Sequence, residues 1–103
     1  MTYILRFVQQ FEPGNANAYL ELEKQFKDIE RVNPSFPKGK RYQPFSGAEP
    51  SNSLVWESEF ESLQAIDAAL KVIADDPTHT ELYTKQSKYI TSARTEIYKI
   101  LDF

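Results

Sequence analysis

Apolar residues change their spacing within residues 54–73, and this change predicts a strand that runs directly into a helix. Leu54, Trp56 and Phe60 share one side of an extended segment, whereas the residues after it recur at three- and four-residue steps, namely Leu63, Ile66, Leu70 and Ile73. Ser62 stands between the two patterns, where its hydroxyl can accept a hydrogen bond from a free N–H group of the first helical turn. We therefore expect a strand ending near Phe60 and a helix over residues 63–73.

Both ends of the chain also alternate with a period of two, which predicts strands over residues 2–11 and 94–103. The first places Tyr3, Leu5, Phe7 and Phe11 on one face, with Ile4, Arg6 and Val8 on the other. The second places Ile97 and Leu101 opposite Tyr98 and Ile100. Apolar residues on both faces indicate a sheet that is covered on both sides. A further short edge strand is expected over residues 40–45, because the prolines around it restrict pairing.

Two amphipathic helices are expected between these strands. Residues 16–32 carry apolar side chains at helical spacing, with Asn15 as the expected N-cap, and the stripe consists of Tyr19, Leu22, Phe26 and Ile29. A last helix is expected from Pro77 to about Ser92, capped by Asp76 or, alternatively, by a capping box of Thr78 and Glu81. Its inward residues would be Leu82, Tyr89 and Ile90.

The order of elements is β-α-β-β-α-β with an extra helix before the last strand, which is the ferredoxin-like α+β pattern. We expect one domain over residues 1–103, with the first and third strands adjacent and parallel and the helices on one face of the sheet. The other face would then be apolar and bare, which is typical of an interface. We therefore predict a homodimer through the sheet face, giving a dimeric α+β barrel.

Composition excludes several classes of function. The chain is 41% hydrophobic and 26% charged, with a net charge of −3, which argues against nucleic acid as a partner. Cysteine is absent, so disulfides and thiol chemistry are excluded. No apolar run approaches the roughly 20 residues that span a bilayer, and no signal-peptide pattern opens the chain. We expect a soluble, cytoplasmic protein without a membrane partner.

Three phrases of the sequence, VWESEFESLQAIDAAL, ADDPTHTELY and TEIYKIL, resemble the NIPSNAP-like branch of the dimeric α+β barrel superfamily. The resemblance covers nearly the whole chain and is clearest from Leu54 onward. It implies a ferredoxin-like protomer that dimerises into a barrel, with a cleft between the sheet and its helices or partner. The wider superfamily includes cofactor-free monooxygenases of the antibiotic-biosynthesis type, muconolactone isomerase-like enzymes, aldoxime dehydratases and haem proteins, so the resemblance selects no single activity.

Arg6 and Glu57 are the first candidate ligand-binding residues. If Trp56 and Phe60 face the helices, Glu57 faces the dimer side, and Arg6 points there from the neighbouring strand. A guanidinium and a carboxylate on a covered sheet could orient a small polar or enolate-like substrate. The alternative is a structural ion pair that lines a wet barrel.

Tyr42 and Tyr98 complete the candidate ligand-binding set. They could shape an aromatic pocket together with Trp56, Tyr3 and Phe45, and Tyr98 is the preferred pocket hydroxyl. The alternative is that these rings fill the core and the interface, where large aromatic side chains contribute much buried area. We assign Trp56 to the core.

The remaining polar groups are interpreted as structural. His79, the only histidine, is taken as a solvated residue in the first turn of a helix, and a lone histidine builds no metal cluster. We therefore predict no metal, haem or other cofactor. Lys38, Lys40 and Arg41 could receive an anionic ligand, but we interpret them as solvated charges that guard an edge strand.

Two classes of function remain open. The first is a cofactor-free monooxygenase-like or related enzyme that acts on an aromatic or polyketide-like compound. The second is a non-catalytic dimeric module that binds a small ligand or serves as a scaffold. An open volume with a few convergent polar groups would favour the enzyme, and a cleft plugged by Trp56, Tyr98 and phenylalanine side chains would favour the module.

Overall fold

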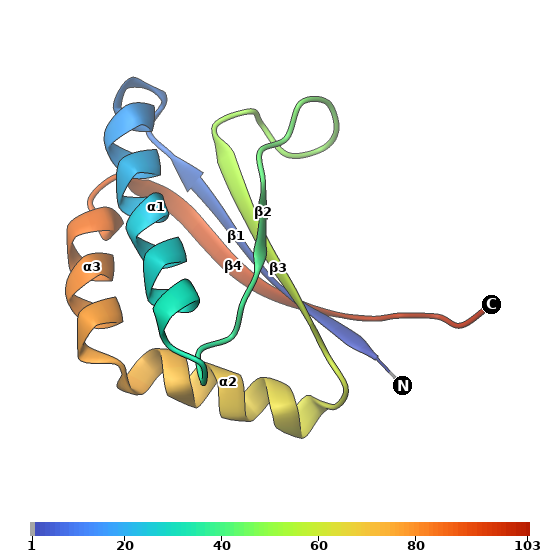
Figure 1. Ribbon diagram of the computed structural model, residues 1–103. Coiled ribbons are helices and arrows are strands. Elements are labelled where there is room, and N and C mark those ends of the chain that lie inside the picture. Colours follow the sequence, from blue (N-terminus) through green and yellow to red (C-terminus); the bar gives the residue numbers. More distant parts are fainter. Residues whose placement is uncertain (1) are drawn as a thin grey trace.

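The computed structural model describes residues 2–103 as one antiparallel sheet with three α-helices on one side (Figure 1). The sheet has the strand order β2-β3-β1-β4. Along the chain the elements are β1 (Tyr3–Phe11), a 3-10 turn η1 (Pro13–Asn15), α1 (Ala16–Val32), β2 (Lys40–Tyr42), β3 (Ser53–Phe60), α2 (Leu63–Asp75), α3 (Pro77–Ser87) and β4 (Ile90–Lys99). This confirms the ferredoxin-like α+β order with its extra helix.

The first and third strands are adjacent, as expected, but the predicted parallel direction is wrong. β1 and β3 run antiparallel, with Arg6 opposite Glu57 and Phe7 opposite Trp56. The crossover through α1 makes β1 parallel to β2, and the connection from β2 to β3 then reverses the chain. Because β3 lies between β1 and β2 in the sheet, it is antiparallel to both.

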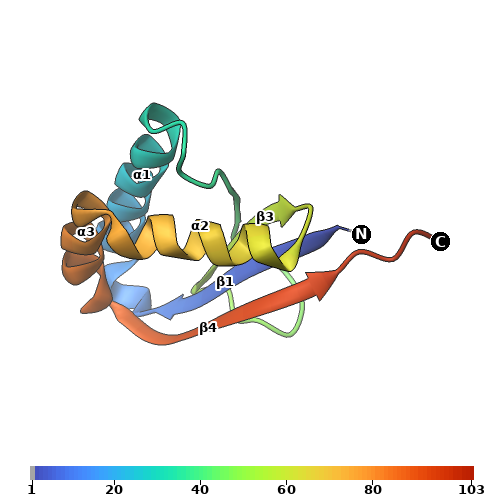
Figure 2. The same cartoon turned by 90° about the horizontal axis from the view of Figure 1, so that it is seen from below.

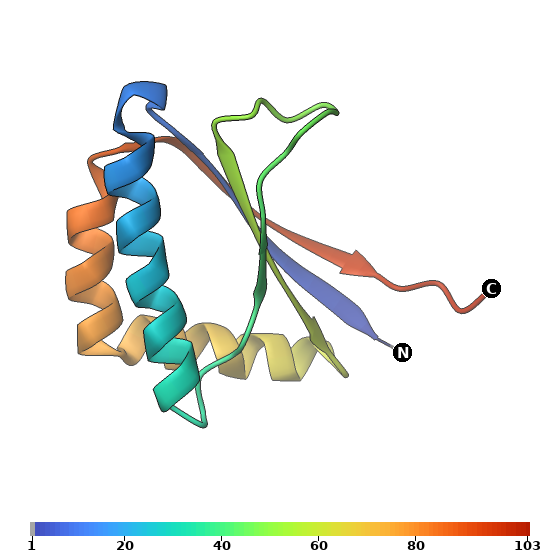
Figure 3. The same ribbon diagram turned by 45° about the horizontal axis from the view of Figure 1, so that its top comes forward.

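Several predicted boundaries also need correction. The edge strand β2 ends at Tyr42 rather than near residue 45, because pairing with β3 extends only over residues 40–42. The last helix ends at Ser87 rather than Ser92, because residues from Ile90 onward already pair with β1. The final strand is therefore shifted from residues 94–103 to residues 90–99, and the chain beyond it extends away from the sheet (Figures 1 and 3).

Local capping explains where two of the helices begin. The Ser62 hydroxyl accepts a hydrogen bond from the N–H of Ala65, which confirms it as the cap of α2. The Asp76 carboxylate accepts from the N–H of His79 at 2.7 Å, so the Asp76 cap is correct for α3. Asn15 stands at the N-cap position of α1, as expected, but η1 precedes the helix and the Asn15 side chain makes no capping hydrogen bond.

The three helices all cover the same face of the sheet, which we call the helix-facing side (Figures 1 and 2). α1 and α3 lie side by side, and α2 crosses below them (Figure 1). Two groups of buried side chains fill this layer, one with Leu5, Trp56 and Ile66 and the other with Phe11, Tyr19 and Leu54. The first group confirms Trp56 as a core residue.

The opposite side of the sheet, the outer face, is partly covered by the chain itself. Val8 and Val55 face outward by register, yet they are only 1% and 5% exposed. The connection over residues 43–52 reaches the end of the outer face that holds Val8 and Val55, where Glu49 forms an ion pair with Arg94. We infer that this connection buries the two valines. The outer face is therefore bare over part of its length rather than over all of it.

No helix in the described part of the chain, residues 2–103, combines the length and the apolar character needed to cross a bilayer.

Candidate functional site

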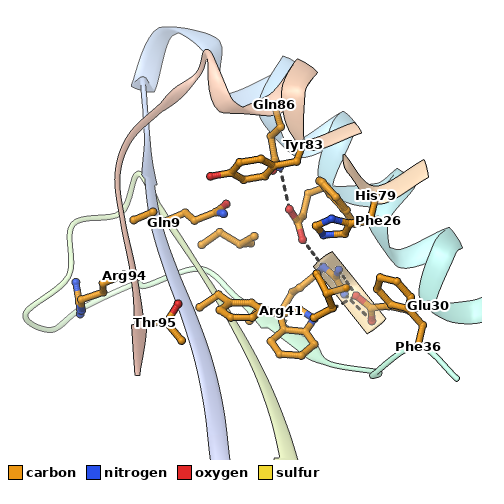
Figure 4. A pocket seen from close by; sticks show the side chains of 16 residues that line it. Gln9, Phe26, Glu30, Phe36, Arg41, His79, Tyr83, Gln86, Arg94 and Thr95 are labelled. Atoms are coloured by element: carbon orange, nitrogen blue, oxygen red, sulfur yellow. Dashed lines mark hydrogen bonds and ion pairs between the residues drawn. The ribbon is translucent and has the colours of Figure 1, made fainter. Parts of the chain in front are cut away.

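A pocket of about 410 Å³ lies between the helix-facing side of the sheet and helices α1 and α3 (Figure 4). Its walls are mainly aromatic, and its polar groups come from α1 and α3 and from the strands β1, β2 and β4. We call it the helix-side pocket. Its lining includes Phe7, Gln9, Glu23, Phe26, Glu30, Phe36, Arg41, Trp56, His79, Tyr83, Gln86 and Arg94.

A buried ionic group, which we call the Arg41 cluster, joins β2 to α1. It consists of Arg41, Glu23 and Glu30. Arg41 donates through Nε to Glu23 Oε2 at 2.7 Å, and through Nη1 and Nη2 to the two oxygens of Glu30 at 3.2 and 2.5 Å. Glu23 is 8% exposed and Glu30 is 3% exposed. The forked guanidinium thus holds two carboxylates that are almost entirely removed from water.

Neighbouring side chains and backbone complete the Arg41 cluster. Trp56 donates its indole N–H to Glu30 Oε2 at 3.1 Å, and the backbone N–H of Gly39 donates to Glu30 Oε1 at 3.0 Å. Gln86, from α3, donates to Glu23 Oε1 at 2.9 Å. Because buried carboxylates are costly unless they are hydrogen-bonded, these donors are what make their burial tolerable.

Close packing at Gly39 fixes the geometry of this cluster. A Cβ atom at Gly39 would lie 2.1 Å from Nε1 of Trp56, so no larger side chain fits without movement. Arg41 pairs with Trp56 in the β2–β3 register, which puts both side chains on the helix-facing side. The turn into β2 therefore places both the N–H of Gly39 and the guanidinium of Arg41 against the carboxylate of Glu30.

The charge state of Arg41 is set by two opposing effects. Burial alone would lower the pKa of its guanidinium, but hydrogen bonding to Glu30 and the charge of Glu23 outweigh it and raise the pKa. Arg41 therefore stays protonated. With two carboxylates against one guanidinium, the cluster carries an excess negative charge when all three groups are ionised.

His79 lies in the wall of the helix-side pocket, so its interpretation as a solvated residue is wrong. Its ring is half-buried and lies 4.8 Å from that of Phe26, 5.8 Å from that of Phe36 and 6.5 Å from that of Tyr83, between ring centroids. Burial lowers the pKa of the imidazole, although the carboxylates of Asp76, Glu23 and Glu30 partly oppose this. The neutral ring can accept a proton from a molecule in the pocket.

A second polar contact links the sheet to α1 at the far end of the pocket. The hydroxyl of Tyr19 donates to Gln9 Oε1 at 2.5 Å, and Gln9 lines the pocket (Figure 4). Burial raises the pKa of Tyr19, and the nearby charge of Glu23 acts in the same direction. Tyr19 therefore stays protonated and acts as a hydrogen-bond donor.

The predicted ligand-binding residues lie elsewhere, on the outer face. Arg6 is brought together with Glu57 at 2.8 Å and with Glu96 at 3.2 Å, and its guanidinium carbon lies 5.0 Å from the ring centre of Tyr98. The Arg6 Nε contact to Glu57 is an ion pair whose alignment is too poor for a hydrogen bond. Tyr42 and Glu57 line a separate hollow of about 390 Å³ at the β2 edge. Their role in ligand binding stays a prediction.

Two sequence-based groupings are corrected by the register. Tyr42 pairs with Val55 on the outer face, whereas Trp56 points to the helices, so the aromatic pocket predicted from these residues together does not form. Phe45 is fully exposed. Arg41 does not form a solvated basic cluster with its neighbours, because its side chain is only 17% exposed and binds buried carboxylates.

Within residues 2–103, no group of three or more histidine, cysteine, aspartate or glutamate side chains is arranged to hold a metal ion. The pocket lining offers an imidazole, hydrogen-bond donors and acceptors, and aromatic walls.

The fold and the helix-side pocket place this chain in the ferredoxin-like α+β class. Searches of the sequence against protein-family models and against curated proteins found no match. Solved structures, in contrast, match along the whole chain. A NIPSNAP family protein from Agrobacterium tumefaciens str. C58 is similar with a TM-score of 0.83 at 17% identity, covering 100% of this chain and 96% of that chain.

Two further structures extend this likeness. An uncharacterized NIPSNAP-like domain protein from Burkholderia xenovorans has a TM-score of 0.79 at 13% identity, covering 99% of this chain and 87% of that chain. An antibiotic biosynthesis monooxygenase has a TM-score of 0.69 at 12% identity, covering 98% and 99%. At these identities the comparison establishes the fold. It confirms that this chain has the ferredoxin-like fold of NIPSNAP-like proteins.

The Arg41 cluster carried one signal in the sequence. Glu23 and Glu30 stand four residues after Tyr19 and Phe26, so they continue an apolar stripe at helical spacing. The apolar stripe expected from the sequence, Tyr19, Leu22, Phe26 and Ile29, fits the same spacing. It assigns the two carboxylates to the polar side of the helix. In the structure Tyr19, Glu23, Phe26 and Glu30 are the buried residues of α1.

Proposed function

We propose that this protein is a cofactor-free monooxygenase-like or related small-molecule enzyme that takes an aromatic substrate in the helix-side pocket. The observation that carries the proposal is the open volume of about 410 Å³, walled by aromatic rings and bounded by a few buried polar groups. The likeness in fold to a protein described as an antibiotic biosynthesis monooxygenase supports it.

His79 is the residue that removes a proton from the substrate in this proposal. Its imidazole lines the pocket, and the lowered pKa keeps the ring neutral near neutral pH. An aromatic ketone with an activated CH₂ group loses a proton to give an enolate. Dioxygen then oxidises this carbon to a carbonyl group. One oxygen atom stays on the carbon and the other leaves with the two hydrogens as water, so the balance requires no external reductant.

Oxygen uptake with anthrone, a polycyclic ketone with such a CH₂ group, tests the proposal. The protein should consume oxygen faster than the spontaneous oxidation of anthrone, and His79→Gln should lower the catalysed rate by on the order of 100-fold. Lys85→Gln, on the exposed side of the same helix α3, is the matched control and should leave the rate unchanged. Uptake no faster than the spontaneous reaction, or uptake that His79→Gln does not change, contradicts the proposal.

The second candidate function is a non-catalytic module that binds a small ligand on the outer face. It is favoured by the hollow of about 390 Å³ that Tyr42 and Glu57 line at the β2 edge. Arg6 lies beside this hollow, through its contact with Glu57. If a ligand uses this site, Arg6→Ala should abolish binding without lowering the thermal unfolding temperature below that of the wild type. A variant that binds normally rules the site out.

We also propose a homodimer through the outer face of the sheet. Ile4 lies there between Glu59 and Tyr98, and both Tyr42 and Tyr98 are about half exposed. Lysine, arginine and glutamate side chains alternate across the same face, which suits pairing with a second copy about a two-fold axis. The connection over residues 43–52 covers the other end of the face, so the contact would centre on the bare end.

A further inference from the structure

The charge of the helix-side pocket points to the kind of substrate that it takes. Two carboxylates, Glu23 and Glu30, share the single guanidinium of Arg41. The other charged side chain that lines the pocket in the described chain, Arg94, forms ion pairs with Glu49 and Glu96. Figure 4 shows Arg94 directed away from the pocket. When all three groups are ionised, the interior therefore holds an excess negative charge, and among residues 2–103 no lining cation balances it.

The two carboxylates differ in their capacity to bind a ligand. A carboxylate accepts about four hydrogen bonds. Glu30 accepts four, from Gly39, Trp56 and two nitrogens of Arg41. Glu23 accepts one from Arg41 and one from Gln86. Glu23 therefore retains room for about two further donors, and its 8% exposure leaves it within reach of a molecule in the pocket.

An anionic ligand is the competing choice, because Arg41 could contact it. Three of the five N–H groups of Arg41 already donate to the two carboxylates, so an anion would have to use the other two. An anion there would lie beside both carboxylates in a poorly solvated site, where like charges repel strongly. A cation would instead balance the excess charge. The pocket therefore favours a cationic ligand over an anionic one.

The pocket walls suit an aromatic cation. Phe7, Phe26, Phe36, Trp56 and Tyr83 line the pocket, and Phe7 and Trp56 are stacked with ring centroids 4.9 Å apart. Aromatic faces attract cations through their ring quadrupole and pack against other rings. The volume of about 410 Å³ lies within the range of sites for small organic molecules.

We propose that the substrate of the helix-side pocket is an aromatic molecule that carries an amine cation, which Glu23 binds. This inference rests on the proposed function, because it concerns the same pocket, and it names the substrate class. The ammonium group donates to the two open positions of the Glu23 carboxylate, and the aromatic body packs against the rings of the opposite wall. The reacting carbon belongs to the aromatic body, within reach of His79.

Three probes of one shape and different charge test the inference at neutral pH: 2-phenylethylamine, 2-phenylethanol and phenylacetate. Trp56 is the only tryptophan and lines the pocket, so its fluorescence reports binding directly. The cation should bind more tightly than the alcohol, and more tightly than the anion by on the order of tenfold or more. Glu23→Gln should remove this preference. Glu21→Gln, on the exposed side of α1, is the matched control and should keep it.

Each outcome separates the substrate class from the proposed function. If phenylacetate or the alcohol binds as tightly as the amine, the cation preference is overturned while the pocket remains a site for aromatic molecules. If the amine binds equally well to Glu23→Gln, the assignment to Glu23 is overturned. If none of the three probes changes the fluorescence of Trp56, the inference fails, and the oxygen-uptake assay with anthrone decides the proposed function separately. Because the wild-type comparison needs no variant, poor folding of Glu23→Gln would not obscure the result.

Discussion

Replacing Arg41 by methionine should destabilise the protein strongly, because it would leave Glu23 and Glu30 buried without their cation. Removing one partner of a buried ion pair costs about 3–5 kcal/mol. A domain of this size has a total stability of about 5–15 kcal/mol, so the loss is a large fraction of it. Each kcal/mol corresponds to about 4–8 °C, so a loss of 3 kcal/mol should lower Tm by about 12–24 °C.

Circular dichroism during heating measures this change. Arg31→Met is the matched control, since Arg31 forms a 2.8 Å ion pair with Asp28 on the exposed side of α1 and should cost at most about 1 kcal/mol. Replacing all three members of the Arg41 cluster, as Arg41→Met with Glu23→Gln and Glu30→Gln, should recover much of the lost stability. The stabilising role of Arg41 between two buried carboxylates is refuted if Arg41→Met lowers Tm no more than the control, or if the triple variant is no more stable than Arg41→Met.

Three further predictions concern other parts of the structure. The imidazole resonance of His79, the only histidine, should titrate below pH 6.5, and Glu23→Gln should lower its pKa further by removing a carboxylate that favours the charged ring. A pKa at or above 6.5 contradicts the half-buried placement of the ring. Because the pKa of His79 is lowered in the folded state, the stabilising contribution of its neutral ring is fully present above pH 6.5 and is lost as the pH falls through the pKa of the folded state. In His79→Gln this part of the pH dependence of Tm should vanish. Gly39→Ala should lower the free energy of unfolding by about 1–3 kcal/mol and shift the Trp56 emission, because its Cβ would meet the indole ring. Gly14→Ala, with open space around it, should not alter the emission. Ile4→Glu should convert the proposed dimer to monomer in light scattering while helix content stays constant, and an unchanged mass would exclude the outer face as the interface.

Periodicity in the sequence was sufficient for most of the fold. The change from strand to helix spacing across residues 54–73 and the caps at Ser62 and Asp76 are local features, and the structure confirms them. The direction of β3 was missed because it depends on how three strands share one sheet, which no local pattern records. The end of the last helix was missed because pairing with β1 competes for residues from Ile90 onward.

The helix-side pocket could not be predicted in the same way. Glu23 and Glu30 are charged, so a sequence pattern alone assigns them to the solvated side of α1. Their burial becomes favourable only because Arg41 donates hydrogen bonds to both of them. Arg41 lies in a proline-rich segment with no regular pattern of its own. His79 is half-buried for a similar reason, because Phe26 and Phe36 pack against it from distant positions in the chain.

Where the ligand binds is tested most directly by the indole N–H resonance of Trp56 in an NMR titration with 2-phenylethylamine. This N–H donates to Glu30 and lies in the wall of the helix-side pocket. Binding in that pocket should shift the indole resonance together with the imidazole resonance of His79, and it should leave the backbone amides of Tyr42 and Glu59 on the outer face unmoved. Shifts at Tyr42 and Glu59 with an unchanged indole resonance would contradict a helix-side ligand site.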